Sequence, residues 1–138
     1  MEPVCLAGIL VDVRHGGCVV AVHADAVRAG AAVPFDVARM ARRGSQNPIA
    51  QYEEMANSAA SNILEKAAQI AKSQGITCEL VHVQDQYPAE GIIATAKDKS
   101  CDLIVMASHG RRGIDRLLLG SQANEVLTHS KVPALIVR

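Results

Sequence analysis

The residues best suited to chemistry lie between positions 107 and 121. This stretch contains glycines at positions 110, 113 and 120 and ends in Ser121. Glycines in a loop allow backbone N–H groups to approach an anion without a Cβ in the way. A helix that begins at Gly120 would add unpaired N–H groups and the positive end of its dipole. The spacing therefore predicts a cradle for a phosphate group, although three glycines before a helix are also typical of ordinary turns.

Two roles are open to the hydroxyl of Ser121, which could cap the helix or donate to a phosphate oxygen. The Gly-Lys-Ser/Thr ending of a P-loop and the Gly-x-Gly-x-x-Gly dinucleotide fingerprint are both absent from the sequence. No general base or metal-binding carboxylate stands beside the loop, so we expect no catalytic residue and at most slow hydrolysis of a bound nucleotide. The cysteines and histidines are not spaced as metal ligands, and we expect no metal site.

The elements that must position this loop are clearest in the second half of the chain. Apolar residues three and four apart predict one face of a helix over residues 49–73: Ile49, Tyr52, Ala56, Ala59, Ala60, Ile63, Ala67, Ile70 and Ala71. Further patterns predict strands over 76–83, 102–107 and 133–137, and helices over 88–98 and 120–130. This alternation favours an α/β fold, an open and mostly parallel sheet sandwiched by helices, with the glycine-rich loop at the carboxyl end of a strand.

Residues 1–48 are less regular. Residues 8–13 and 18–23 both look like strands, but a parallel crossover needs roughly a dozen residues or more, and only Arg14-His15-Gly16-Gly17 separates them. Either they pair as a hairpin around Gly16-Gly17 or one of them is not a strand. Residues 24–47 predict an irregular connection. We therefore expect a single domain over residues 1–138 with a shortened or irregular first βα unit and an atypical part over residues 1–48.

The composition is that of a globular protein, with 49% hydrophobic and 20% charged residues in 138 positions. The formal net charge is +0, so no long-range field favours nucleic acid or an anionic membrane. No apolar run approaches the ~18 residues of a membrane span, and we expect no signal peptide. The spacing of the four cysteines favours free thiols in a cytoplasmic protein.

Residues 102–113 (DLIVMASHGRRG), 117–121 (LLLGS), 126–127 (VL) and 132–137 (VPALIV) form a recognisable set. Over roughly residues 51–138, this set resembles the signature of the universal stress protein family. In the nucleotide-binding branch of that family, the motif is glycine, two residues, glycine, nine residues, then glycine with serine or threonine. Gly110 matches the second glycine and Gly120-Ser121 the closing pair, whereas Ala107 replaces the first glycine.

The resemblance implies a five-stranded parallel sheet and a homodimer that pairs through its last strand, residues 133–137. It also implies ATP or another adenine nucleotide as the ligand, with Mg²⁺ as a candidate companion ion. The nucleotide-binding residues that it implies are Met106 and Ala107 against the ribose or adenine, Gly110, Gly120, Ser121 and Gln122 around the phosphates, and Arg111 as a charge beside them. Asp12 and Val22 are further candidates for the adenosine side.

These observations support two main hypotheses. The first is a stress-response protein that binds an adenine nucleotide and acts as a regulator. The second is a dimeric interaction scaffold whose nucleotide site has degenerated. Ala107 and the short N-terminal part favour the second, because family members place an aspartate near the end of their first strand and a full helix behind it. An ATP-consuming enzyme is a third hypothesis, for which the sequence offers no catalytic residue.

Overall fold

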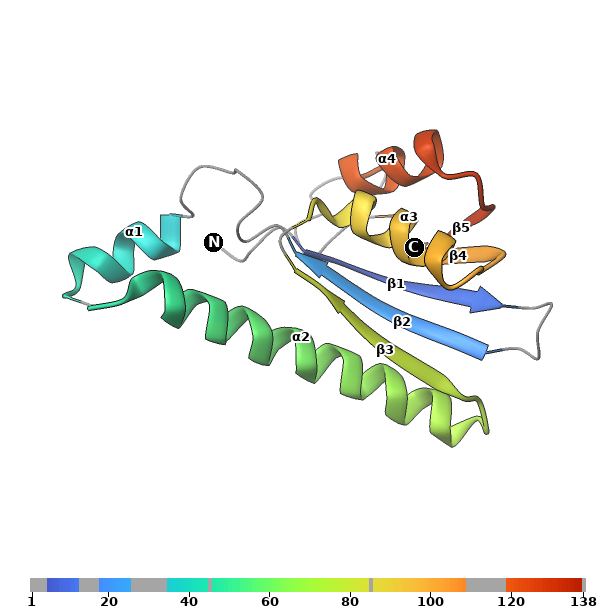
Figure 1. Cartoon of the computed structure of the whole chain (residues 1–138), viewed down its shortest axis with the longest axis horizontal. Helices are drawn as coiled ribbons and strands as arrows, with labels where there is room; N and C mark the ends of the chain where they lie inside the picture. Colours follow the sequence, from blue (N-terminus) through green and yellow to red (C-terminus); the bar gives the residue numbers. More distant parts are fainter. Residues whose placement is uncertain are drawn as a thin grey trace.

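The structure is a computed structural model that describes residues 5–12, 18–25, 35–44, 46–84, 86–108 and 119–137. Its elements in chain order are β1 (Cys5–Asp12), β2 (Cys18–Asp25), α1 (Phe35–Arg42), α2 (Pro48–Ser73), β3 (Cys78–Val83), α3 (Pro88–Asp98), β4 (Leu103–Ala107), α4 (Ser121–His129) and β5 (Ala134–Val137). A five-stranded sheet forms the middle layer, with α2 on one face and α3 and α4 on the other (Figure 1). The elements predicted after residue 48 are confirmed, with bounds that agree within two residues.

The sheet has the order β3-β2-β1-β4-β5, and β1 at its centre runs against both neighbours. The pairs β2–β3 and β4–β5 are parallel, so the predicted mostly parallel sheet is confirmed. The hairpin is also confirmed, because Val11 pairs with Val19 and Asp12 with Cys18; its predicted turn, Gly16-Gly17, lies outside the described residues. The all-parallel sheet that the resemblance implies is wrong at β1, since the chain from Asp12 to Cys18 is too short for a crossover.

Beneath α3 and α4, the sheet contributes its side of a well-packed apolar core. The cluster of buried side chains comes from β2, α3, β4, α4 and the turn before β4, and it contains Val20, Val22, Ala24, Ala89, Ile92, Ala96, Cys101, Ile104, Met106, Ala123 and Val126. Gly91 lets α3 approach the sheet closely, because a Cβ at this position would lie 2.9 Å from Cγ1 of Val83 and 3.2 Å from Cβ of Ala24. The helix that leads into β4 is therefore fixed tightly to β2 and β3.

On the other face, α2 covers β2 and β3. Asn47 caps this helix by accepting from the N–H of Ala50 at 3.2 Å, and Gly75 follows its end in the left-handed region, with φ of +69°. The predicted apolar face is partly wrong: Ile49 and Ile70 are exposed, while the helix is buried at Tyr52, Ala56, Ala60, Leu64 and Ala71. α2 extends beyond the sheet at its N-terminal end, so Ile49 has no strand to cover (Figure 1).

The expected irregular connection over residues 24–47 is wrong in part, because it contains the helix α1. α1 packs against the N-terminal part of α2, outside the area of the sheet (Figure 1). A helix of eight residues is marginal in water by itself, so we expect its contact with α2 to stabilise it. None of the helices in the described ranges combines the length and the apolarity needed to span a membrane.

Candidate functional site

The carboxyl ends of the four parallel strands lie side by side along one edge of the sheet. This edge is formed by strand ends, unlike the two sides formed by the outer strands β3 and β5, and it is called the functional edge below. β2 ends at Asp25, β3 at Val83, β4 at Ala107 and β5 at Val137. Ligands of open α/β sheets bind at this edge, where the winding of the chain changes direction. The connection from β2 to β3 uses α2 on one face of the sheet, and the later connections use α3 and α4 on the other face (Figure 1). The direction of winding therefore changes between β2 and β4, the neighbours of β1.

The base of the glycine-rich loop is closed by two backbone hydrogen bonds. The N–H of Ser108 donates to the carbonyl of Val137 at 2.9 Å, and the N–H of Gly120 donates to the carbonyl of Ser108 at 2.8 Å. The loop therefore leaves β4 and returns to α4 at the same point of the sheet edge. Because the N–H of Gly120 already has this acceptor, Gly120 shapes the loop, and its N–H is not available to a phosphate. Gly110 and Arg111 lie outside the described residues.

The N-terminus of α4 presents backbone donors at this point. Gly120 is the N-cap residue, with φ of −60° and ψ of 151°, and no side chain caps the helix. The first intrahelical bond runs from the N–H of Asn124 to the carbonyl of Gly120 at 2.9 Å, so the N–H groups of residues 121–123 have no intrahelical acceptor. Ser121 is the first helical residue and is exposed. Of its two predicted roles, capping is not used, and its hydroxyl remains available to a ligand.

The side chain of Gln122 points away from a phosphate cradle. Its Oε1 accepts a hydrogen bond from the N–H of Ala89 at 3.0 Å, in a partly buried position at the start of α3. The N-cap residue of α3, Tyr87, makes no side-chain cap, and Pro88 has no N–H. Gln122 thus reaches from α4 to satisfy the first N–H of the neighbouring helix. The sequence carried one signal for this contact, namely the lack of Ser, Thr, Asp or Asn before Pro88.

Two predicted adenosine contacts are buried in the core instead. Met106 is 2% exposed and Val22 is 1% exposed, both within the cluster beneath α3 and α4. Their side chains pack against helices, so only the backbone of Met106 lies near the loop. Ala107 is exposed at the end of β4. Among the described non-glycine residues only Ser100 has a positive φ, so the φ of Ala107 is negative. The methyl group of Ala107 therefore causes no backbone strain at the position where the motif has glycine.

Asp12 is not brought to the loop. Gly8 pairs with Met106, which places Ala7 level with Ala107, and Asp12 lies five positions further along β1. At about 3.4 Å per residue this is about 17 Å away. The reversal of β1 carries its carboxyl end to the opposite edge of the sheet. Asp25 is the last residue of β2, so its backbone lies at the same end of the sheet as the loop.

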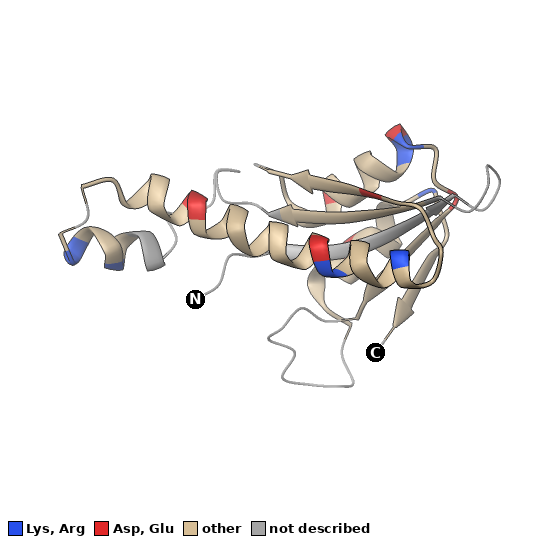
Figure 2. Cartoon of the chain, turned by 90° about the horizontal axis from the view of Figure 1, so that it is seen from below, with Lys and Arg blue, Asp and Glu red and all other residues tan. Residues whose placement is uncertain are grey.

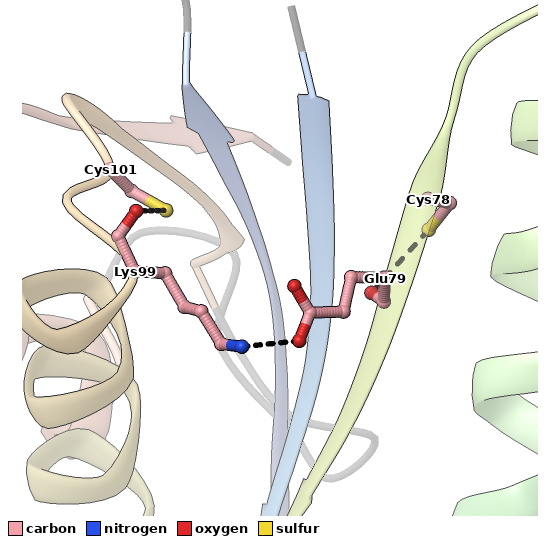
Figure 3. A network of polar contacts seen from close by, with 4 residues as sticks. All are labelled: Cys78, Glu79, Lys99 and Cys101. Atoms are coloured by element: carbon pink, nitrogen blue, oxygen red, sulfur yellow. Dashed lines mark hydrogen bonds and ion pairs between the residues drawn. The ribbon is translucent and has the colours of Figure 1, made fainter. Parts of the chain in front are cut away.

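The polar network at the opposite edge has a structural character. Lys99, at the end of α3, forms an ion pair with Glu79 near the start of β3 (Figure 3). The hydrogen bond and the charge of Glu79 raise the pKa of Lys99 above its ordinary value. Cys78 Sγ contacts the carbonyl of Glu79 at 3.7 Å, and Cys101 Sγ contacts the carbonyl of Lys99 at 3.9 Å (Figure 3). This network connects the amino ends of strands and is remote from the loop.

Neither charge nor metal ligands distinguish another site in the described ranges. Along α2, the acidic residues Glu53, Glu54 and Glu65 precede the basic residues Lys66 and Lys72 (Figure 2). Among the residues that the structure describes, no three His, Cys, Asp or Glu side chains are grouped to hold a metal ion. An open hollow of about 500 Å³ lies against α2 and contains no predicted site residue; its described lining is Ala50, Glu53, Glu54, Asn57, Ser58, Ser61 and Asn62.

Comparison with known proteins gives a consistent result. The model of the Universal stress protein family matches residues 13–138. Universal stress protein YxiE of Bacillus subtilis is 38% identical over 76 residues, which are 55% of this chain and 51% of that protein. Universal stress protein MJ0531 of Methanocaldococcus jannaschii is 35% identical over 77 residues, 54% of this chain and 44% of that protein. The chain thus spans about half the length of these curated relatives.

A solved structure shares the fold. It is described as a structure-based assignment of the biochemical function of the hypothetical protein MJ0577. It superposes with a TM-score of 0.58 at 24% identity, over 73% of this chain and 66% of that chain. At this identity the likeness shows the architecture, an α/β sheet between helices.

Proposed function

The chain belongs to the universal stress protein family, and on this premise we propose that it binds an adenine nucleotide such as ATP and acts as a stress-response regulator. The first turn of α4 carries the proposal. It lies at the carboxyl edge of the sheet, follows the family's glycine-rich loop, and offers the N–H groups of Ser121 and Gln122 together with an exposed hydroxyl. Unpaired N–H groups and the helix dipole both favour a phosphate at this position.

The remaining ligand contacts are proposed on the basis of the family motif. Phosphate oxygens accept from Ser121, and the backbone at Ala107 lies beside the ribose or adenine. Gly110 and Arg111 complete the phosphate side as the family motif implies. Mg²⁺ would accompany the nucleotide rather than occupy a site of its own, since the described residues group no set of metal ligands. Among the residues that the structure describes, no general base stands next to the first turn of α4, so we expect any hydrolysis to be slow and the nucleotide to act as a signal.

The proposal extends to a homodimer and to a cytoplasmic location. β5 is an edge strand of the sheet, and a row of unpaired backbone groups on an edge is a template for pairing with another chain. Leu135 and Val137 on this strand are exposed, with 52% and 44% of their surface accessible. A second copy would cover them. Cys78 and Cys101 are not joined in a disulfide, as is usual in proteins of a reducing compartment.

A thermal melt with and without millimolar Mg-ATP tests the nucleotide proposal. At about one hundred times the dissociation constant, a ligand specific for the folded state adds roughly 2.7 kcal/mol, which raises the melting temperature by roughly 5–10 °C. Ser121→Asp sharpens the test. A carboxylate in the first helical turn stabilises the ligand-free protein slightly, yet it repels phosphate, so the melt without ATP should be unchanged or higher while the shift disappears. Ser58→Asp on the exposed side of α2 is the control and should keep the full shift.

A scaffold without nucleotide is the second candidate, and the position of Asp12 favours it. With β1 reversed, the aspartate that family members carry on the adenosine side is not replaced by Asp12. The absorbance of freshly purified protein at 260 nm separates the two candidates. Retained nucleotide supports binding. A spectrum free of nucleotide, together with no melt shift in Mg-ATP, identifies the scaffold.

A further inference from the structure

The start of α4 is held from two sides, and only one of them belongs to the glycine-rich loop. On the sheet side, the N–H of Gly120 donates to Ser108, directly after β4. On the helix side, the side chain of Gln122 accepts from the N–H of Ala89. The two contacts hold the residues on either side of Ser121, Gly120 before it and Gln122 after it. We therefore expect the N–H groups in the first turn of α4 to keep a fixed orientation only while both contacts are present.

The hydrogen bond between Gln122 and Ala89 connects α4 to α3, which is held rigidly against the sheet. Ala89 is fully buried at the start of α3, and Ile92, one turn later, is fully buried as well. Gly91 places the backbone of α3 so close to the sheet that a Cβ would lie 2.9 Å from Cγ1 of Val83. α3 thus cannot follow a movement of α4. A side chain that binds α4 to α3 transfers this rigidity to the first turn of α4.

The contact also meets a need of α3 itself. A buried N–H without an acceptor is costly, and Ala89 supplies the first N–H of α3 because Pro88 has none. The residue before them, Tyr87, makes no side-chain cap. The acceptor comes from 33 residues further along the chain. One hydrogen bond therefore satisfies the start of α3 and orients the start of α4.

We propose that Gln122 is a positioning residue, whose side chain caps α3 at Ala89 and thereby holds the first turn of α4 in the orientation that receives phosphate. This deepens the proposed function and rests on it for the nature of the ligand. The side chain of Gln122 itself does not touch the nucleotide; only its backbone N–H does. The phosphate site thus depends on a side chain that points away from it.

Gln122→Met tests the proposal, because it keeps the length of the side chain and the helix propensity but removes the acceptor. Hydrogen exchange of the ligand-free protein should show faster exchange at the N–H of Ala89 and at that of Asn124, the first bonded N–H of α4. Gln122→Glu retains an acceptor and should restore the protection of Ala89. Gln69→Met, the same change at an exposed position of α2, should leave both amides unchanged.

Calorimetric titration with Mg-ATP supplies the second readout. Gln122→Met should weaken binding by about tenfold, because the misaligned first turn of α4 would lose the equivalent of one N–H bond to phosphate, while Gln69→Met should bind as the wild type does. Equal affinity in Gln122→Met despite faster exchange at Ala89 overturns the positioning role and leaves the proposed function intact. If the wild type binds no nucleotide, the proposed function fails. Faster exchange at the N–H of Asn124 in Gln122→Met would then still show that Gln122 orders the start of α4. Unchanged exchange at both amides in Gln122→Met overturns the positioning role in either case.

Discussion

The two faces of the sheet differ in how completely helices cover them. Beneath α3 and α4, sheet side chains such as Val22 and Ile104 are at most 1% exposed. On the face that α2 shares, exposure is higher toward the edges, and Leu80 and Leu135 are 40% and 52% exposed. A helix is about 10 Å wide and strands are about 4.8 Å apart, so one helix covers roughly two strands. Two helices nearly cover five strands, whereas α2 alone, among the described elements, covers β2 and β3.

This difference separates the part of the fold that carries stability from the part that is open to partners. The α3–α4 face contains the buried cluster and holds both helices whose first turns meet at the functional edge. The α2 face is partly open at β4 and β5, where the proposed dimer forms. Substitutions on the two faces should therefore differ in size and in kind.

Matched isoleucine substitutions give the largest expected effect. Ile104→Ala removes a fully buried side chain and should lower the free energy of unfolding by about 2–5 kcal/mol. Ile70→Ala, at a position 67% exposed on α2, should change it by less than about 0.5 kcal/mol. Equilibrium unfolding in urea measures both. Equal losses would contradict the contrast between the faces.

Gly91→Ala should have the next largest effect. The added methyl group meets Val83 Cγ1 at 2.9 Å and Ala24 Cβ at 3.2 Å, so α3 or the strands must shift. Overpacking of this kind costs about 1–3 kcal/mol, which the better helix propensity of alanine offsets by about 1 kcal/mol. Urea unfolding should show a net loss. A gain in stability would mean that α3 is not held against β2 and β3 as described.

Leu135→Lys should alter assembly more than stability. A lysine on an edge strand opposes pairing with a second chain, while an exposed position changes the free energy of unfolding by about 0.5 kcal/mol or less. Light scattering after size-exclusion chromatography should show a dimer for the wild type and a monomer for the variant. Lys131→Leu, a change at an exposed position just before β5, is the control and should remain dimeric. A Leu135→Lys dimer would contradict pairing through β5.

The smallest effect is expected from the ion pair between Lys99 and Glu79. Glu79 raises the pKa of Lys99, so the contribution of this pair is fully present from neutral pH up to the ordinary pKa of lysine and is lost as the pH rises through the raised pKa. Urea midpoints of the wild type and Glu79→Gln should therefore differ slightly near neutral pH and converge in strongly alkaline solution. Both side chains are largely exposed, so added salt should also reduce the difference. A difference that grows with pH would contradict this account.

Local sequence signals were sufficient wherever one short segment decides its own structure. Pro88 and the apolar spacing after it gave the bounds of α3, and the four residues between two apolar runs excluded a crossover and favoured the hairpin. The loop before Ser121 was identified in the same way. α1 was missed because it is only eight residues long and lies between Pro34 and Gly44, which favour turns, although its own residues are amphipathic.

The sequence by itself determined every strand and helix after residue 48, the position of the glycine-rich loop along the chain, and the family to which the chain belongs. Only the tertiary structure decided which way each side chain faces. It placed Met106 and Val22 in the core, carried Asp12 to the far edge through the reversal of β1, and joined Gln122 to Ala89. The physical reason is that periodicity reports the local environment of a segment, whereas these outcomes depend on strand order and on contacts between residues distant in the chain.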